Sequence, residues 1–277
     1  MKVILHGIRG SYPASTKMNQ KYGGNTSCIE IVEGDKRIIL DAGTGILGID
    51  FDIYRESDQI NIFLTHLHMD HIQGLAFFRP LFNPKQQVHI WGPRDSSESL
   101  QTRLNRFLSP PLFPIPLRDI PSQLKIHEMP ETPVDLGPFR ISSQYVSHPG
   151  PTLGYRVQSG GRVVTYLPDH ETVIGRSALY REDEWISGFN LAANADLLIH
   201  DAQYTPQEYQ NKIGWGHSST DMAVEFGMRT HAKSLVLIHH DPNHSDIQID
   251  EMHKQLMQRN SVDFSVQMGQ QGQEIEV

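Results

Sequence analysis

Three histidines and an aspartate stand within six consecutive residues, directly after a strand-like apolar run. The run is Asn61–Thr65, and the hexad His-Leu-His-Met-Asp-His begins at His66. Side chains two residues apart in extended backbone point the same way, so His66 and His68 can bind one ion. If the chain then turns, Asp70 and His71 can face a second ion. Imidazole and carboxylate ligands suit Zn²⁺, Mn²⁺ or Fe²⁺, so the hexad predicts a site for two divalent transition-metal ions.

The same arrangement, a polar side chain just past the end of an apolar strand, recurs along the chain. If these strands end at a common edge, the polar residues form one cluster above an apolar sandwich. Each residue alone could be an ordinary loop residue, but together with the hexad they favour a single functional site. They are Asp41, His148, Asp169, His200 with Asp201, and His239 with His240.

Short runs rich in β-branched residues predict most of the secondary structure. The predicted strands are Met1–Gly7, Ile29–Val32, Arg37–Leu40, Asn61–Thr65, Val88–Trp91, Phe139–Val146, Thr152–Val157, Arg162–Leu167, Leu197–Ile199, Leu235–Ile238 and Val262–Val266. The predicted helices are Ser96–Leu108, Thr220–Met228, capped by Ser219 or Thr220, and Asp246–Arg259. Strands in series with interspersed helices favour two sheets packed face to face under helices. A chain of 277 residues can form one large domain or two small ones, and we expect a single domain over 1–277.

The segment Ser109–Leu117 contains four prolines and cannot be a central strand or a helix. We expect an apolar, semi-rigid loop between the two halves of the molecule. It is either a connection packed on the surface or, with Phe77 and Phe78, a wall of the substrate pocket. The chain has a single cysteine, Cys28, which excludes an internal disulfide and a thiolate-rich zinc site. Cys28 lies in a strand-like run, so we expect it in the core.

The charge balance argues against a protein that grips a long nucleic acid. The chain carries 24 Lys and Arg against 32 Asp and Glu, a formal net charge of −8, whereas polymer binding usually requires a basic face. Extended nucleic acid is therefore an unlikely partner. No apolar run is long enough to span a membrane, and the start of the chain predicts a strand rather than a signal peptide, so the expected location is cytoplasmic. A homodimer is compatible with the sequence.

The hexad resembles the HxHxDH signature of the metallo-β-lactamase superfamily, and the resemblance covers essentially the whole chain. Four further segments look like the branch that holds phosphoribosyl 1,2-cyclic phosphate phosphodiesterases and tRNase Z-like hydrolases. The resemblance implies an α/β four-layer αββα sandwich. The four segments are Gly23–Cys28, Leu40–Gly45, Gly154–Arg156 and Gly216–Ser219.

The resemblance also implies how the ligands divide between two ions. One ion would be held by His66, His68 and His148, and Asp169 would bridge it to the second. The second would be held by Asp70, His71 and His239, with Asp70 also a catalytic residue. His239 is chosen over His240 because it matches the family position after the strand, which leaves His240 behind the ligands or facing substrate.

A pair of metal ions lowers the pKa of a shared water and clamps phosphoryl oxygens, so the implied reaction is cleavage of a phosphodiester by a bridging hydroxide. His217 resembles the histidine of the branch's Gly-His-Ser loop, and Asp201 resembles its carboxylate partner. A carboxylate beside an imidazole keeps it protonated and oriented, as a general acid for the leaving oxygen requires. The predicted substrate is a small cyclic or nucleotide-type phosphodiester.

Several other functions use this fold. A thioester hydrolase resembling glyoxalase II has the same ligands, but a thiolate leaves without a proton donor, so the pair His217 and Asp201 favours phosphodiester chemistry. A tRNA 3′-processing endonuclease is a second alternative, disfavoured by the acidic charge and by the lack of a long inserted arm. A mononuclear iron dioxygenase and a non-catalytic scaffold are disfavoured because no ligand of the two-metal set is missing.

Overall fold

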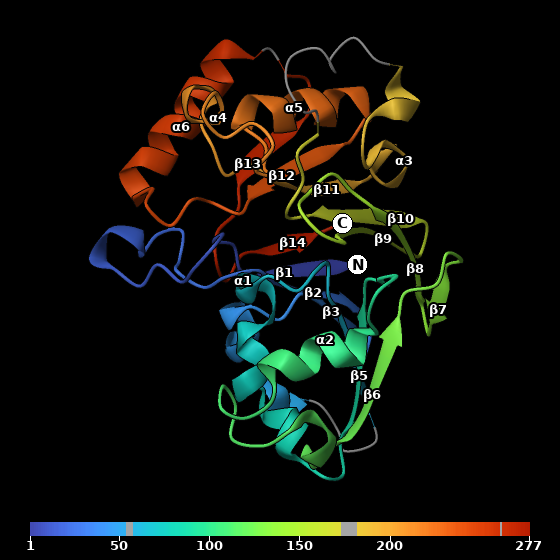
Figure 1. Cartoon of the computed structure of the whole chain (residues 1–277). Coiled ribbons are helices and arrows are strands. Elements are labelled where there is room, and N and C mark those ends of the chain that lie inside the picture. Colours follow the sequence, from blue (N-terminus) through green and yellow to red (C-terminus); the bar gives the residue numbers. More distant parts are fainter. Residues whose placement is uncertain (54–57, 173–181, 261) are drawn as a thin grey trace.

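Two seven-stranded sheets pack face to face at the centre of the molecule (Figure 1). The computed structural model describes residues 1–53, 58–172, 182–260 and 262–277. The first sheet has the strand order β14-β1-β2-β3-β4-β5-β6 and the second has the order β13-β12-β11-β10-β9-β8-β7. The strands are β1 Lys2–Gly7, β2 Cys28–Glu33, β3 Lys36–Leu40, β4 Gln59–Phe63, β5 Gln87–Gly92, β6 Gln123–Glu128, β7 Val134–Leu136, β8 Phe139–Tyr145, β9 Leu153–Ser159, β10 Arg162–Leu167, β11 Leu197–Asp201, β12 Ser234–Ile238, β13 Ser265–Met268 and β14 Glu274–Glu276.

Helices cover the outer face of each sheet, which completes a four-layer αββα sandwich (Figure 1). In the first half α2 packs against β6, and in the second half α5 and α6 pack against β11, β12 and β13. The α-helices are α1 Met69–Ile72, α2 Leu100–Phe107, α3 Phe189–Ala192, α4 Pro206–Tyr209, α5 Thr220–Arg229 and α6 Asp246–Arg259. Short 3₁₀ helices are Lys17–Asn19, Thr44–Gly48, Phe51–Ile53, Gln73–Phe77, Arg79–Phe82, Leu117–Asp119 and Asp183–Trp185.

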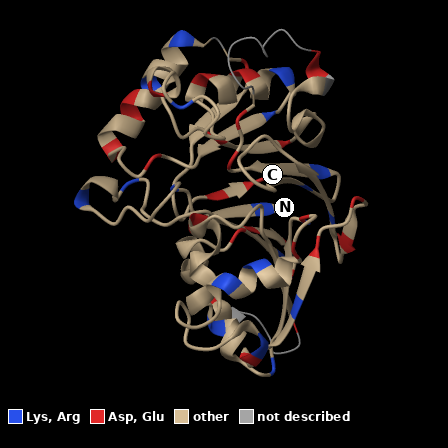
Figure 2. Cartoon of the chain, viewed as in Figure 1, with Lys and Arg blue, Asp and Glu red and all other residues tan. Residues whose placement is uncertain are grey.

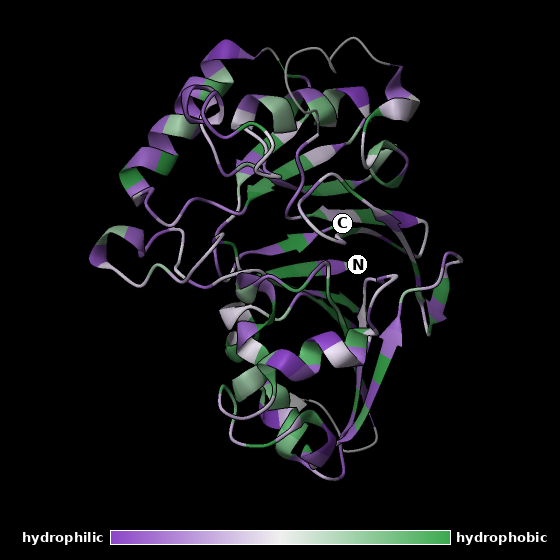
Figure 3. Cartoon of the chain, in the orientation of Figure 1, coloured by the Kyte–Doolittle hydropathy of each residue, from purple (hydrophilic) through white to green (hydrophobic). Residues whose placement is uncertain are grey.

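Apolar side chains fill the spaces between these layers, and Figure 3 shows hydrophobic residues along many of the central strands. One core cluster joins the two sheets, for example through Leu5, Phe63 and Tyr155. A second lies between the first sheet and its helices and includes Leu64 and Leu104. Burial of apolar surface from water therefore holds the sheets in a fixed relation, and the loops at their edges inherit that relation.

The strand directions bring the polar loops to one edge. In the first sheet β3, β4, β5 and β6 are parallel. In the second sheet β10, β11 and β12 are parallel, and β8 runs in their direction because both β8 and β10 are antiparallel to β9. The carboxyl ends of parallel strands meet at the same edge, where α/β proteins place their sites. The predicted common edge is therefore present.

Most predicted elements are confirmed, and several boundaries were wrong. The helix expected over Ser96–Leu108 begins only at Leu100, because Ser99 caps it and Asp95 accepts hydrogen bonds from Ser97 in a preceding turn. The last predicted strand, Val262–Val266, is instead Ser265–Met268. The strands β7 and β14 were not predicted because each has only three residues, and β6 was missed because it is half-exposed and polar. Ser219 caps α5, as one of the two proposed caps.

The proline-rich segment lies elsewhere than predicted. It follows α2 and leads into β6 of the first sheet, so it does not connect the two halves. Phe78, which one of the two alternatives placed in a pocket wall, is fully buried in the core of the first half, whereas Phe77 is 72% exposed. Cys28 is buried, as expected. Among the described residues no helix is long and apolar enough to cross a membrane.

Candidate metal centre

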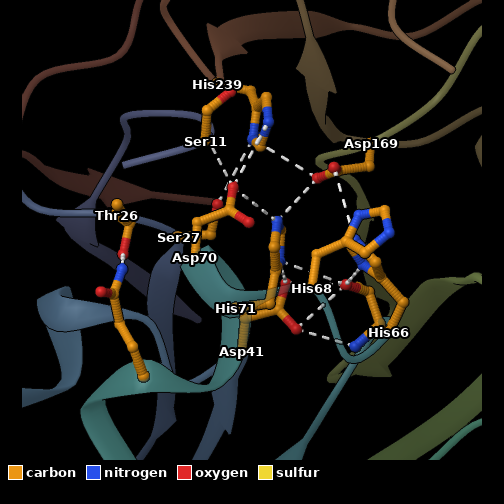
Figure 4. Close-up of polar contacts among 12 residues, drawn as sticks. Ser11, Thr26, Ser27, Asp41, His66, His68, Asp70, His71, Asp169 and His239 are labelled. Carbon is orange, nitrogen blue, oxygen red and sulfur yellow. Dashed lines mark hydrogen bonds and ion pairs between the residues drawn. The ribbon is translucent and has the colours of Figure 1, made fainter. Parts of the chain in front are cut away.

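The hexad lies at the junction of β4 and α1. Extended backbone carries His66 past the end of β4, and His68 is the residue that precedes α1. Asp70 and His71 fall in the single turn of α1, which directs them back toward the sheet edge, and both are buried. The predicted change of direction within the hexad is therefore what separates its two pairs of side chains (Figure 4).

All seven predicted ligands come together at this edge. Their candidate ligand atoms form two groups, each with its atoms within 4.8 Å of one another. The first group adds His148, which follows β8, and Asp169, which follows β10, to the first two histidines of the hexad. The second adds His239, which follows β12, to the other two residues of the hexad. The groups are His66, His68, His148 and Asp169, and Asp70, His71 and His239.

The carboxylate of Asp169 lies between the two groups. Its Oδ2 is 3.6 Å from His66 Nε2 and 3.7 Å from His148 Nε2. Its Oδ1 is 2.9 Å from His71 Nε2 and 3.4 Å from His239 Nδ1. Each oxygen therefore faces a different group, which is the arrangement that a carboxylate bridging two ions requires.

Four potential ligand atoms of this cluster are buried without a hydrogen bond, and they converge on one another, unlike the other unpaired atoms of the described residues. Buried polar groups are almost always paired, so four unpaired atoms that converge point to a missing partner. A divalent cation is the partner that imidazole nitrogens and carboxylate oxygens share. Among the described residues the atoms are His66 Nε2, His71 Nε2, His239 Nε2 and Asp169 Oδ1.

The electrostatics of the cluster also fit a cation. Burial lowers the pKa of His71, yet the negative charges around it raise that pKa well above its ordinary value. The charges belong to Asp169, Asp70 and Asp41. Burial lowers the pKa of His66 well below its ordinary value, so this imidazole is neutral and free to bind a metal. The carboxylates thus create a negative potential in a buried site whose histidines can be ligands.

Asp41 supports the cluster from beneath. Its Oδ2 lies 2.8 Å from His71 Nδ1, and its Oδ1 accepts a 2.7 Å hydrogen bond from the backbone N–H of Thr65. The hydroxyl of Tyr166 donates to the same carboxylate at 3.0 Å. Because His71 donates its Nδ1 hydrogen to Asp41, its Nε2 is directed to the metal site, the carboxylate–histidine arrangement that strengthens a ligand. The sequence marked Asp41 as a strand-end residue without predicting this role.

Unusual backbone accompanies the ligands. His239 has φ +61° and Asp41 has φ +61°, a left-handed region that non-glycine residues rarely adopt. Two glycines allow close approach: a Cβ at Gly10 would lie 2.4 Å from the His239 ring, and one at Gly216 would lie 2.3 Å from His148 Nδ1. Both contacts are shorter than any real Cβ contact, so only glycine fits at these positions.

His217 lies beside the cluster with a carboxylate behind it. Its Nδ1 is 2.7 Å from Asp201 Oδ2, and its ring stacks on that of His239 with the centroids 4.9 Å apart. Burial lowers the pKa of His217, but the charge and hydrogen bond of Asp201 outweigh it and raise that pKa to about 9. With Nδ1 bonded to Asp201, Nε2 is left to face the site. His217 also lies within ligand distance of Asp169 and His239.

Glu171, which no sequence pattern singled out, is buried and ties two site loops together. Its carboxylate accepts hydrogen bonds from the hydroxyl of Tyr209 at 2.7 Å and from the N–H groups of Gly214 and Gly216 at 2.9 Å each. Gly216 in turn lies with its carbonyl 2.9 Å from His148 Nδ1, which turns the other nitrogen of that ring to the site. Only the fold brings residue 171 to residues 209–216.

Two other contacts settle smaller questions. The backbone N–H of Ser11 donates to Asp70 Oδ2 at 2.7 Å, a contact that the sequence did not suggest. His240 belongs to neither ligand group: its Nε2 lies 3.1 Å from the carbonyl of Gly269, and its side chain is buried. Within the described residues, His240 thus lies behind the site rather than facing a substrate.

Residues 36–240 match the sequence model described as the beta-lactamase superfamily domain. The chain belongs to the metallo-β-lactamase superfamily. Membership and the clustered His and Asp residues together identify it as a metal-dependent hydrolase, as the hexad predicted.

Comparison with other members gives the same fold and a tRNase Z-like branch. Ribonuclease Z of Thermoplasma acidophilum is 24% identical over 90% of this chain and 89% of its own length. Among solved structures, the metallo-β-lactamase fold protein YhfI from Bacillus subtilis superposes with a TM-score of 0.71 at 19% identity over 99% of both chains. The short form of human tRNase Z superposes with a TM-score of 0.68 at 22% identity over 100% of this chain and 99% of its own.

A diphosphatase of the PhnP family is also similar, with a TM-score of 0.67 at 17% identity over 99% of this chain and 96% of its own. At these identities the solved structures show a shared fold and not a shared substrate. The curated relatives named ribonuclease Z count against our prediction that extended nucleic acid is an unlikely partner.

Proposed function

We propose that this hydrolase is a two-metal phosphodiesterase acting on a small cyclic or nucleotide-type phosphodiester. The observation that carries the proposal is the pair of His217 and Asp201, 2.7 Å apart, at the edge of the ligand cluster. An alkoxide leaving group needs a proton as the P–O bond breaks, whereas a thiolate does not. The pair therefore favours a phosphodiester over a thioester.

The proposed ligands divide as the two groups do. One ion would be held by His66, His68 and His148, and Asp169 would bridge it to the second. The second ion would be held by the second group, Asp70, His71 and His239. Bound there, two divalent ions supply a nucleophilic water at neutral pH and stabilise the charge on the phosphoryl oxygens. Zn²⁺, Mn²⁺ and Fe²⁺ all suit this nitrogen and oxygen donor set.

The residues of the chain then have separate tasks. His217 holds a proton on Nε2 and passes it to the departing oxygen, while Asp201 keeps the ring charged and fixes its orientation. Asp70 carries its own negative charge into the site, held there by the N–H of Ser11 and by His71, whose Nε2 lies 3.4 Å from its carboxylate. We propose Asp70 as both ligand and catalytic residue.

The second candidate is a tRNA 3′-processing endonuclease, which the relatives named ribonuclease Z favour. Against it stands the charge: Figure 2 shows acidic and basic residues interspersed along the chain, and the net charge is −8. Phosphate-rich polymers usually require a basic face.

One hydrolysis screen tests these functions together. The metal-loaded protein is offered bis(p-nitrophenyl) phosphate, cyclic nucleotides, a precursor tRNA, S-lactoylglutathione and nitrocefin. We expect the small phosphodiesters to be hydrolysed with a rate that changes little between roughly 50 and 200 mM salt. Faster cleavage of the precursor tRNA with steep salt dependence would replace the small-substrate proposal by the endonuclease, and cleavage of S-lactoylglutathione alone would replace both.

A further inference from the structure

A cavity of about 420 Å³ opens directly beside the first group of ligands. It lies between α1, α2, the proline-rich loop and the turn that follows His148. Its walls have two chemical characters, one apolar and one basic. The residues that line it are His66, Leu67, His68, Met69, Ile72, Asp95, Arg103, Arg106, Phe107, Leu112 and Pro149–Pro151.

The apolar wall is exposed although it is made of large side chains. Met69 is 51% exposed and Leu112 is 71% exposed, and Phe107 lies between the cavity and a second, larger one of about 840 Å³. Leu112 and Phe107 line both cavities, so the apolar surface continues from the ligands along α2. Ligand-binding sites in proteins are typically apolar clefts with a few placed polar groups.

The basic wall is formed by one face of α2. Arg103 and Arg106 are three residues apart and therefore neighbours on the helix surface. Arg103 bonds the carbonyl of Pro93 through one terminal nitrogen, but its Nε is buried and has no hydrogen-bond partner among the described residues. Arg106 is 70% exposed and pairs with Glu98 at 2.6 Å, and such a surface ion pair is weak and exchangeable.

The one acidic residue on this wall is already engaged. Asp95 accepts hydrogen bonds from the N–H of Ser97 at 2.7 Å and from its hydroxyl at 2.6 Å. Asp95 keeps its negative charge, so the two arginines and one aspartate that line the cavity leave it one net positive charge, with Glu98 paired to Arg106 outside the lining.

We propose that this cavity is a subsite for a second anionic group of the substrate. This inference rests on the proposed function: the scissile phosphodiester lies at the ligands, an apolar or aromatic spacer packs on Phe107 and Leu112, and a phosphate beyond it is bound by Arg103 and Arg106. A guanidinium group suits phosphate because its planar N–H groups can bond two phosphate oxygens together. Arg103 and Arg106 are then specificity-determining residues that do not touch the reacting atoms.

Two substrates that differ by one phosphate test the subsite. The first is the p-nitrophenyl ester of thymidine 5′-monophosphate, and the second is the same ester with an added 3′-phosphate. The measured quantity is the ratio of their kcat/KM values. We expect a ratio of about ten or more in favour of the added phosphate, since hydrogen bonds to charged groups contribute this much, and a ratio near one in the double variant Arg103→Met with Arg106→Met.

Matched control variants distinguish the loss of a charge or an apolar contact in the cavity from a general loss of folding or stability. Arg140→Met removes an exposed arginine near the start of β8, far along the strand from His148, and leaves the ratio unchanged. Leu112→Gln raises KM for both esters several-fold, because the spacer loses apolar contact. Ile247→Gln, which changes an apolar side chain that is 80% exposed on α6, does not.

Binding of the products tests the subsite without catalysis. By calorimetry, thymidine 3′,5′-bisphosphate should bind the wild-type protein about ten-fold more tightly than thymidine 5′-monophosphate, and the double variant should lose the difference. If neither ester is hydrolysed, the proposed function is wrong, and calorimetry still decides the subsite. Equal binding of the two nucleotides by the wild type, or a preference that survives in the double variant, overturns the subsite.

Discussion

Replacing Asp201 by Asn should separate the proton-donating role of His217 from metal binding. Asp201 is fully buried, and it raises the pKa of His217 to about 9 from an ordinary value of 6.5. The amide of Asn carries no charge, so the largest influence that raises the pKa of His217 is removed and that pKa falls toward its ordinary value, although the charges of Asp169 and Asp70 still raise it. A full return to 6.5 would correspond to about 3 kcal/mol of lost stabilisation of the charged imidazole.

The loss has a defined size and pH dependence. At pH 8 an imidazole with a pKa of about 9 is roughly nine-tenths protonated, and one with a pKa of 6.5 is about 3% protonated, so the rate should fall by up to about 30-fold. The alkaline limb of the pH–rate profile should move to lower pH. Bound metal ions shift the alkaline limb to lower pH in both proteins. Because the wild type and the variant carry the same ions, the difference between their limbs still reports the role of Asp201.

The assay is kcat/KM between pH 6 and pH 10 on an alkyl phosphodiester and on bis(p-nitrophenyl) phosphate, with metal content measured on the same samples. The variant should keep its metals and should lose much less on the nitrophenyl ester, since p-nitrophenolate leaves without a proton. The backbone N–H groups of His170 and Gln203 also donate to Asp201, and the amide oxygen of Asn can still accept from them. An unmoved alkaline limb with equal losses on both esters would refute the role given to His217.

Four further outcomes are expected. Asp169→Ala should remove metal and activity together, as measured by elemental analysis, and full activity after chelation would exclude the metal centre. Asp41→Asn should weaken metal binding about 10- to 100-fold in a competition titration, because His71 loses its orienting carboxylate; an unchanged affinity would show that Thr65 and the fold suffice. Glu171→Gln places an amide donor against the N–H groups of Gly214 and Gly216 and should speed amide hydrogen exchange in residues 209–216. The variant should also release one bound ion more readily than the other. Faster exchange spread evenly over the chain would instead indicate a general loss of stability. Folding raises the pKa of His217 to about 9, so its ion pair with Asp201 contributes its full stabilisation of the metal-free protein below about pH 6.5. That stabilisation disappears as the pH rises through about 9. In urea titrations, His217→Gln should therefore lower the free energy of unfolding at pH 6 and hardly change it at pH 10.

The chemistry of the site could be read from the sequence because it is local to strand ends. Period-two spacing places His66 and His68 on one side of extended chain, and each remaining ligand follows an apolar run whose burial is itself predictable from composition. Those two regularities predicted two packed sheets with a polar cluster at one edge, and the resemblance of the hexad to the metallo-β-lactamase signature supplied the four-layer fold and the division into two ligand groups.

What the sequence could not supply are contacts between segments far apart in the chain. The resemblance named His239, but the physical reason that its ring reaches the cluster is a left-handed backbone at residue 239 and Gly10 lying against its ring. The clamp formed by Glu171 depends on a loop some 40 residues later. The cavity formed by α2 and Leu112 also exists only once the helix packs on its sheet. Such contacts arise when apolar burial fixes the layers against one another, and no spacing within a single segment encodes that arrangement.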